Sequence, residues 1–124
     1  MAAPANLLNK IYVVQQQTKS LLVTVKTSDG APANLTGAEM YMTVRDKIGG
    51  TVLITKSTAD DIDITCPEDG QATITLTTED TDIATGCLTY DIWVSCPQTT
   101  PPTRHPVVKH AEMVVEPAIT DFTP

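Results

Sequence analysis

The side chains that could do chemistry are few and widely spaced. The chain holds two histidines, His105 and His110, and three cysteines, Cys66, Cys87 and Cys96. Five residues apart on or beside a strand, the histidines would point to opposite faces and would not share a metal. A zinc site would have to gather the cysteines from distant strands. We therefore expect no metal centre and no cofactor at these residues.

Catalytic motifs are missing from the sequence as well. It contains no G-x-S-x-G nucleophile turn, no phosphate-binding G-x-x-x-x-G-K loop and no H-E-x-x-H helix, and its serines stand singly in turns or at strand ends. These absences favour a protein that is not an enzyme. We assign no catalytic residue.

Carboxylates do cluster, and they give the best metal candidate. Calcium prefers several carboxylate oxygens from one loop, and five acidic residues lie close together in the sequence. The D-x-D-x-D-G pattern of a calcium loop is absent, so the pattern favours a solvated acidic turn that promotes solubility. The five candidate ligands are Asp60, Asp61, Asp63, Glu68 and Asp69.

Charge and composition exclude further classes. The net charge is −7 and only eight Lys and Arg are present, so a nucleic-acid partner is not expected. No apolar run is long enough to cross a bilayer, and the N-terminus lacks the basic start of a secretory signal. We expect a single folded domain that is made in a cytoplasm, without a membrane partner.

A cytoplasmic origin also predicts three free thiols. If 88–95 is one strand, Cys87 and Cys96 lie roughly 30 Å apart, at about 3.3 Å per residue, and on opposite faces, so they cannot bridge each other. Small buried thiols are the favoured interpretation of all three cysteines.

Strict alternation of apolar and polar residues predicts the elements that must position these side chains. About seven short runs of period two are separated by turn signals such as Asp29-Gly30 and Gly49-Gly50, which predicts an all-β chain, an antiparallel immunoglobulin-like β-sandwich. The predicted inward faces are Leu21, Val23 and Val25; Ala38, Met40, Met42 and Val44; Ile62 and Ile64; Ala72, Ile74 and Leu76; Leu88, Tyr90, Ile92 and Val94; and Ala111, Met113 and Val115.

Two segments interrupt the alternation. Residues 77–86 have a threonine cap, early acidic residues and a closing glycine, which predict one short helical turn. The Pro-rich segment 96–106 predicts a long exposed loop, since proline cannot donate to a ladder.

The domain boundaries follow from the same pattern. We expect an N-terminal arm at 1–19, the sandwich at 20–120 and a tail at 121–124. The arm carries Leu7, Leu8, Ile11 and Val13, which must be buried somewhere. Two alternatives stay open for it: an added edge strand of the same sandwich, or strand addition to a neighbouring subunit.

Alternation also places Trp93 on the outer face of its strand, because its neighbours Ile92 and Val94 point inward. If the last strand pairs nearby, Val108, His110, Glu112 and Val114 share that outer face and flank Trp93 in a small amphipathic patch. Exposed patches with a central Trp commonly mark interfaces. We therefore predict self-association through Trp93, with cover by the arm or the Pro-rich loop as the alternative.

The order of several phrases resembles the immunoglobulin-like domains of tailed-phage structural proteins, in particular the N-terminal domain of the upper baseplate protein family. The similarity runs from about residue 21 to residue 120, and the chain departs from the family pattern at Cys87 and Leu88. The phrases are "PANLTGA" at 32–38, "VRD" at 44–46, "GQATITL" at 70–76, "T-x-x-D-T-x-x-x-x-G-x-x-x-Y-D-I" at 77–92 and "HAEMVVEPAIT" at 110–120.

This resemblance implies a non-enzymatic structural component of a virion, in baseplate, tail, fibre or capsid surface. Its partners would be other virion structural proteins, and it would act as a homo-oligomer after synthesis in the host cytoplasm. The alternative is a host-surface or carbohydrate-binding module that uses the acidic loops or the Pro-rich loop. The chain has only five aromatic residues, which favours the structural class.

Overall fold

The computed structural model describes residues 10–27, 29–98 and 100–119, and within them the chain is all-β. This confirms the predicted class. Alternating, β-branched sequence between turn residues explains the strands, since every second side chain can be buried while the others stay in water. The elements are β1 (Ile11–Val14), β2 (Lys19–Thr24), β3 (Glu39–Arg45), β4 (Val52–Ser57), β5 (Ile62–Cys66), the 3₁₀ turn η1 (Pro67–Asp69), β6 (Gln71–Leu76), β7 (Gly86–Cys96) and β8 (Thr103–Glu116).

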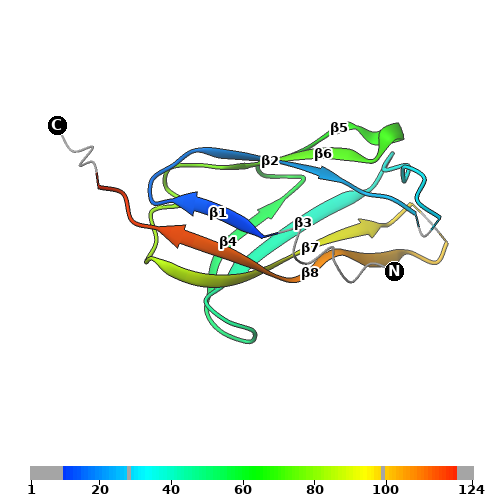
Figure 1. The fold of residues 1–124 in the computed structure, drawn as a ribbon. Coiled ribbons are helices and arrows are strands. Elements are labelled where there is room, and N and C mark those ends of the chain that lie inside the picture. Colours follow the sequence, from blue (N-terminus) through cyan, green and yellow to red (C-terminus); the bar gives the residue numbers. More distant parts are fainter. Residues whose placement is uncertain (1–9, 28, 99, 120–124) are drawn as a thin grey trace.

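These strands form two sheets, seen as two layers in Figure 1. The larger sheet has the order β1-β8-β7-β3-β4 and curls into a half-barrel, and the smaller has the order β2-β6-β5. Every pair is antiparallel except β1 with β8. The long β7 and β8 lie in the middle of the larger sheet, and one face of each is turned away from the core.

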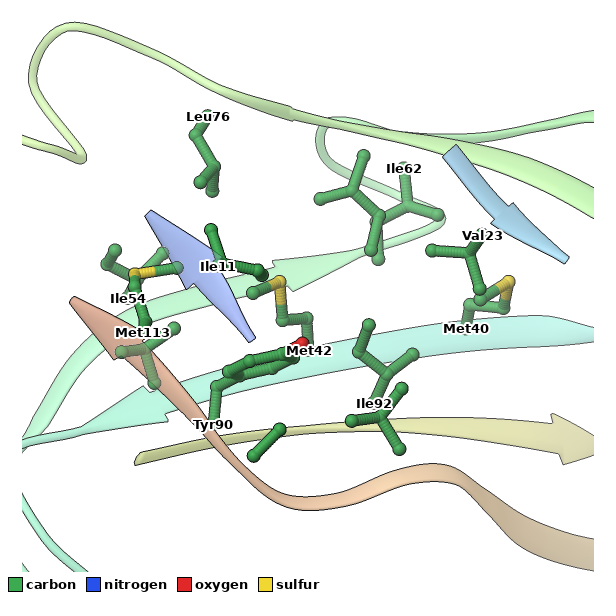
Figure 2. Packing of buried hydrophobic residues seen from close by; sticks show 14 of the residues in the cluster. Ile11, Val23, Met40, Met42, Ile54, Ile62, Leu76, Tyr90, Ile92 and Met113 are labelled. Carbon is green, nitrogen blue, oxygen red and sulfur yellow. The ribbon is translucent and has the colours of Figure 1, made fainter. Parts of the chain in front are cut away.

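The core lies between the sheets and confirms the predicted inward faces. Figure 2 shows Met42, Tyr90 and Ile92 of the larger sheet pointing toward Leu76 and Ile62 of the smaller one. Each such side chain contributes about 1.5–3 kcal/mol when it is fully buried. Within the predicted faces, only Leu21 and Ile64 are partly rather than fully buried.

The end of the N-terminal arm is an edge strand of this same fold. β1 pairs in parallel with the C-terminal end of β8, with Ile11 opposite Met113 and Val13 opposite Val115. Ile11 and Val13 are buried, so of the two alternatives the added edge strand of the same chain is confirmed, and the placing of these two residues in an interface with a neighbouring subunit is wrong. The physical reason is that the edge of β8 is open there and accepts a strand with an apolar inner face.

The segment after β6 forms a single turn rather than a helix. The Thr77 hydroxyl accepts a hydrogen bond from the Asp80 amide, and the Asp80 carboxylate accepts one from the Thr77 amide. The predicted threonine cap and single turn are therefore present, since the Thr81 amide also donates to the Thr77 carbonyl at 3.2 Å. The Thr81 side chain is buried and donates to the carbonyl of Gln17. The only 3₁₀ turn among the described residues is η1, between β5 and β6.

The Pro-rich loop is shorter than predicted. β8 begins at Thr103, and Pro106 lies opposite Trp93 within the β7–β8 ladder. The register shifts between Ile92 and Trp93, and an irregularity of this kind is where a strand accommodates a residue that cannot donate a ladder hydrogen bond. The longer β8 brings Arg104 onto the outer face beside β7.

One glycine marks a close approach between loops. Gly70 ends η1 with φ of 69°, and a Cβ there would lie 2.3 Å from the carbonyl oxygen of Val25 and 2.8 Å from that of Ala33. Neither backbone group can move without breaking the hairpin that continues β2. A glycine is therefore required at this position.

In the part of the chain that the structure describes, we find no helix with the length and apolar character needed to cross a membrane.

Candidate docking surface

The outer face of the larger sheet carries two aromatic rings side by side. Tyr41 of β3 and Trp93 of β7 are direct partners in the antiparallel register, and they are 43% and 38% exposed. Opposed Cβ atoms in such a pair lie about 4.5–5.5 Å apart, which is contact range for aromatic rings. The predicted outward position of Trp93 is confirmed, and Tyr41 joins it.

Carboxylates on the same strands pair with the polar atoms of both rings. The Trp93 Nε1 donates to Oδ2 of Asp91 at 3.0 Å, and the Tyr41 hydroxyl donates to Oε1 of Glu39 at 2.9 Å. Each partner lies two residues from its ring and therefore on the same face. Because the polar atoms are paired within the chain, the rings present mainly apolar surface to solvent, as the anchors of protein interfaces do.

A groove of about 690 Å³ runs past the rings and contains both arginines of the chain, Arg45 and Arg104. This is notable in a chain of net charge −7. The Arg45 Nη1 donates to the carbonyl oxygen of Gly50 at 2.8 Å, which positions the guanidinium beside the β3–β4 loop. Ile48 in that loop is 70% exposed and also lines the groove. The other lining residues are Tyr41, Thr43, Gly49, Thr89, Tyr90, Asp91, Trp93, Val94, Ser95 and His110.

A β-bulge in β8 changes the composition of the predicted patch. The register shifts between Tyr90 and Ile92, where Lys109 and His110 occupy the space of one residue, and His110 has φ of 46°. The extra residue reverses the alternation that precedes it. Val108 is therefore buried, and the prediction that it lies on the outer face is wrong.

His110 and Val114 both lie outside the core, but they do not lie together. His110 is exposed and lines the groove. Val114 is half-buried near the other end of β8, opposite Cys87 and away from the groove. The assignment of Leu7 and Leu8 to an interface falls outside the described residues.

A small polar cluster surrounds Val114. The carboxylate of Glu112 accepts a hydrogen bond from the Sγ of Cys87 at 3.0 Å and lies 3.4 Å from the Nζ of Lys10. The hydrogen bond to Glu112 raises the pKa of the Cys87 thiol, because the thiol form is the one that donates. A raised pKa lowers the fraction of thiolate, the form of cysteine that acts as a nucleophile.

All three cysteines are free, in agreement with the prediction. Their placement differs from the favoured interpretation, since Cys66 and Cys87 are exposed and Cys96 is partly buried. Each stands at the end of a strand, where burial is incomplete.

The acidic residues of the calcium candidate are not arranged around a common centre. Asp61 bonds the ammonium of Lys56, while the other four point to solvent and are exposed. Among the residues that the structure places, no group of three or more His, Cys, Asp or Glu side chains is arranged to hold a metal ion. The cluster is a set of solvated turns and strand ends.

One buried charge, the ammonium of Lys56, lies between two partly exposed carboxylates. This residue takes an inward position on β4, and its side chain is 4% exposed. The Nζ lies 2.6 Å from Oδ2 of Asp61 and 2.6 Å from Oδ2 of Asp80. Burial alone would lower the pKa of Lys56, but hydrogen bonds and charge from the two carboxylates outweigh it and raise the pKa.

In Asp80, burial and hydrogen bonding also oppose each other, and the net effect on the pKa has the opposite direction. Burial alone would raise its pKa, while hydrogen bonds from Lys56 and from both the hydroxyl and the backbone of Thr77 lower the pKa below its ordinary value. Lys56 and Asp80 therefore both stay charged. Their ion pair joins β4 to the turn after β6.

No protein-family model matches the sequence, and no curated protein matches it either.

Proposed function

We propose that this protein is a non-enzymatic structural component of a tailed-phage virion, built as an immunoglobulin-like domain that docks onto neighbouring virion proteins. The observation that carries the proposal is the exposed Tyr41–Trp93 pair on the outer face of the larger sheet. The phrase order in the sequence supports the virion context, and the two-layered, mostly antiparallel fold is compatible with the immunoglobulin-like type. Synthesis in the host cytoplasm agrees with the three free thiols.

The outer face suits a protein partner. Trp, Tyr and Arg are the residues that most often carry binding energy at interfaces, and here all three types meet in one groove, at Trp93, Tyr41 and Arg45. The surrounding carboxylates, Glu39 and Asp91, form a polar rim that fixes ring orientation. A neighbouring copy or another virion structural protein would cover the rings, while the acidic chain as a whole disfavours nucleic acid.

Electron microscopy of purified particles labelled with an antibody against this chain tests the virion assignment. We expect label at one structural position, on head, neck, tail or baseplate. Particles that carry no label, from a host that expresses the chain, would contradict the proposal.

Light scattering tests whether a copy of the chain is one of the partners. We expect a mass above the 13.3 kDa of one chain, and a lower mass for Trp93→Ser, with the β-type circular dichroism unchanged. If the wild-type chain stays monomeric at high concentration, self-association through Trp93 is wrong, and the face is left for binding other virion proteins.

A second candidate function is carbohydrate binding on the virion surface. The specific observation in its favour is again Tyr41 beside Trp93, since paired aromatic faces stack on sugar rings, with Arg45 and Arg104 near enough to bond hydroxyl or carboxylate groups. Trp93 is the only tryptophan of the chain, so its fluorescence reports on this groove alone. Saturable quenching or enhancement by an oligosaccharide would favour this candidate, and an unchanged spectrum across neutral and acidic saccharides would favour the structural one.

A further inference from the structure

A second groove, on a different side of the molecule, is basic although the chain is acidic. It lies where the edge strand β2 of the smaller sheet faces β1 and β8 of the larger one, and it measures about 800 Å³. Lys10, Lys19 and Lys26 line it, and no acidic residue does. Half of the chain's six lysines are therefore gathered in one groove. Lys10 is paired with Glu112, but Lys19 and Lys26 have no carboxylate within ion-pair distance among the described residues.

The groove is bordered by open strand edges and by exposed apolar side chains. β2 stands at one end of the smaller sheet, and among the described strands it pairs only with β6. β1 covers β8 only from Met113 onward. Leu22 is 69% exposed and Tyr12 is 54% exposed at the groove's border. An open edge of this kind is a template for an added strand.

The opposite end of the same sheet has the complementary character. β5 is the other edge strand, and it is also open on its outer side along Asp63. Asp60, Asp63, Glu68 and Asp69 are exposed on or next to this strand, and none of them takes part in an ion pair within the described chain. One molecule therefore presents a basic open edge and an acidic open edge at the two ends of one three-stranded sheet, as the places of β2 and β5 in Figure 1 indicate.

We propose that copies of this chain associate side by side, with the acidic β5 edge of one copy docking at the basic β2 groove of the next. We assign a second copy as the occupant because the basic groove attracts acidic side chains, and the β5 edge at the other end of the same sheet carries exposed acidic side chains. Such a contact joins two different surfaces and is heterologous, so it generates a ring or a row of subunits rather than a closed pair. It is independent of the Tyr41–Trp93 face, which lies on the outer side of the other sheet.

Mixing two charge-reversed variants tests this contact. The first variant, Lys19→Glu with Lys26→Glu, loses the basic edge and keeps the acidic one. The second, Asp60→Lys with Asp63→Lys and Glu68→Lys, makes the β5 edge net basic and keeps the basic β2 groove. In the Trp93→Ser background, where the aromatic face does not associate, each variant alone is expected to be monomeric, because its two edges now carry the same sign of charge. In a mixture, the unmutated acidic β5 edge of the first variant can meet the unmutated basic β2 groove of the second, and the two mutated edges also carry opposite charges, so we expect a species of at least twice the 13.3 kDa chain mass. That species should dissociate as salt is raised, since exposed ion pairs are screened.

The controls separate this proposal from the proposed function. Lys47→Glu with Asp82→Lys changes exposed charges of both signs elsewhere and should leave the association unchanged. Every mixture is repeated in the Trp93→Ser background, where a contact through the aromatic face cannot contribute. A species of at least double mass that persists in the Trp93→Ser background supports the lateral contact, whether or not the wild-type chain also associates through the Trp93 face. Mixtures that stay at the monomer mass in the Trp93→Ser background would overturn the lateral contact.

Discussion

Lys56 is a charged residue at an inward strand position, so its environment has to supply partners for its ammonium. Its ammonium lies between two carboxylates, those of Asp61 and Asp80, at 2.6 Å each. A lysine is tolerated at an inward strand position only because these two carboxylates pair with it. Without a partner, a buried ammonium would lose its proton or move out to solvent. The sequence alone did not reveal this, because alternation marks position 56 as inward without indicating which carboxylates reach it.

Replacement of Lys56 by Met should destabilise the protein, because it removes the ammonium and leaves Asp80 half desolvated. Loss of one partner from a fully buried pair costs about 3–5 kcal/mol, and since these carboxylates are partly exposed we expect about 2 kcal/mol. Urea unfolding followed by circular dichroism measures the change. Lys47→Met, at an exposed site, is the matched control and should stay close to wild type. Equal stability of the two variants would contradict the structural role of the cluster.

The same cluster predicts a specific acid sensitivity. The folded pKa of Asp80 is lower than its ordinary value of 3.8, so the native state binds fewer protons than the unfolded state in this range. The stability from Asp80 is then fully present above pH 3.8 and is lost as the pH falls through the lower folded pKa. We expect Asp80→Asn to be less stable at neutral pH and to show a shallower loss of stability in acid. Parallel acid limbs for variant and wild type would show that another carboxylate dominates.

At the scale of elements, β1 is the clearest case of a segment whose role the structure decides. Its alternation left two destinations open, the chain's own sheet or a neighbour, because a single strand does not encode its partner. Pairing with β8 buries Ile11 and Val13 and leaves Tyr12 and Val14 outward. The arm at residues 11–14 thus belongs to the fold.

Two double variants of β1 test this directly. Ile11→Ser with Val13→Ser removes the buried pair and should lower the free energy of unfolding by about 4 kcal/mol, at about 1.5–3 kcal/mol for each side chain. Tyr12→Ser with Val14→Ser changes the outward pair on the same strand and should cost less than about 1 kcal/mol. Thermal unfolding of both variants gives the comparison. A similar loss in the two would mean that β1 does not pack on the core as described.

The elements also show where alternation stops being informative. It predicted the inward faces of β3, β6 and β7 well, because each is an unbroken period of two over a buried surface. It failed at Val108, since the bulge at Lys109 and His110 inserts one residue that no sequence rule marked. It also could not pair Tyr41 with Trp93. That contact depends on the register of two strands more than forty residues apart, although both residues were already placed on outward faces.

At the scale of the whole molecule, the charge distribution is as informative as the fold. A net charge of −7 gives a soluble, self-repelling surface. Against that background, the two arginines gather in the aromatic groove and three lysines gather along β2 and β1. Both positive regions are therefore placed where a partner with acidic character could be bound, one through the sheet face and one through the sheet edge.

Incorporation into particles tests most directly our proposal that the chain enters a virion through the Tyr41–Trp93 face. The measurement is the amount of chain per purified particle, by quantitative immunoblot, for wild type, Trp93→Ser and the control Val52→Ser, which changes an exposed residue of β4 outside the groove. Circular dichroism first establishes that all three are folded. We predict that wild type and Val52→Ser are incorporated equally and that Trp93→Ser falls at least about tenfold, the loss expected for removal of an interface anchor worth about 1.4 kcal/mol or more. Full incorporation of Trp93→Ser, or particles that never contain the chain, would contradict the account.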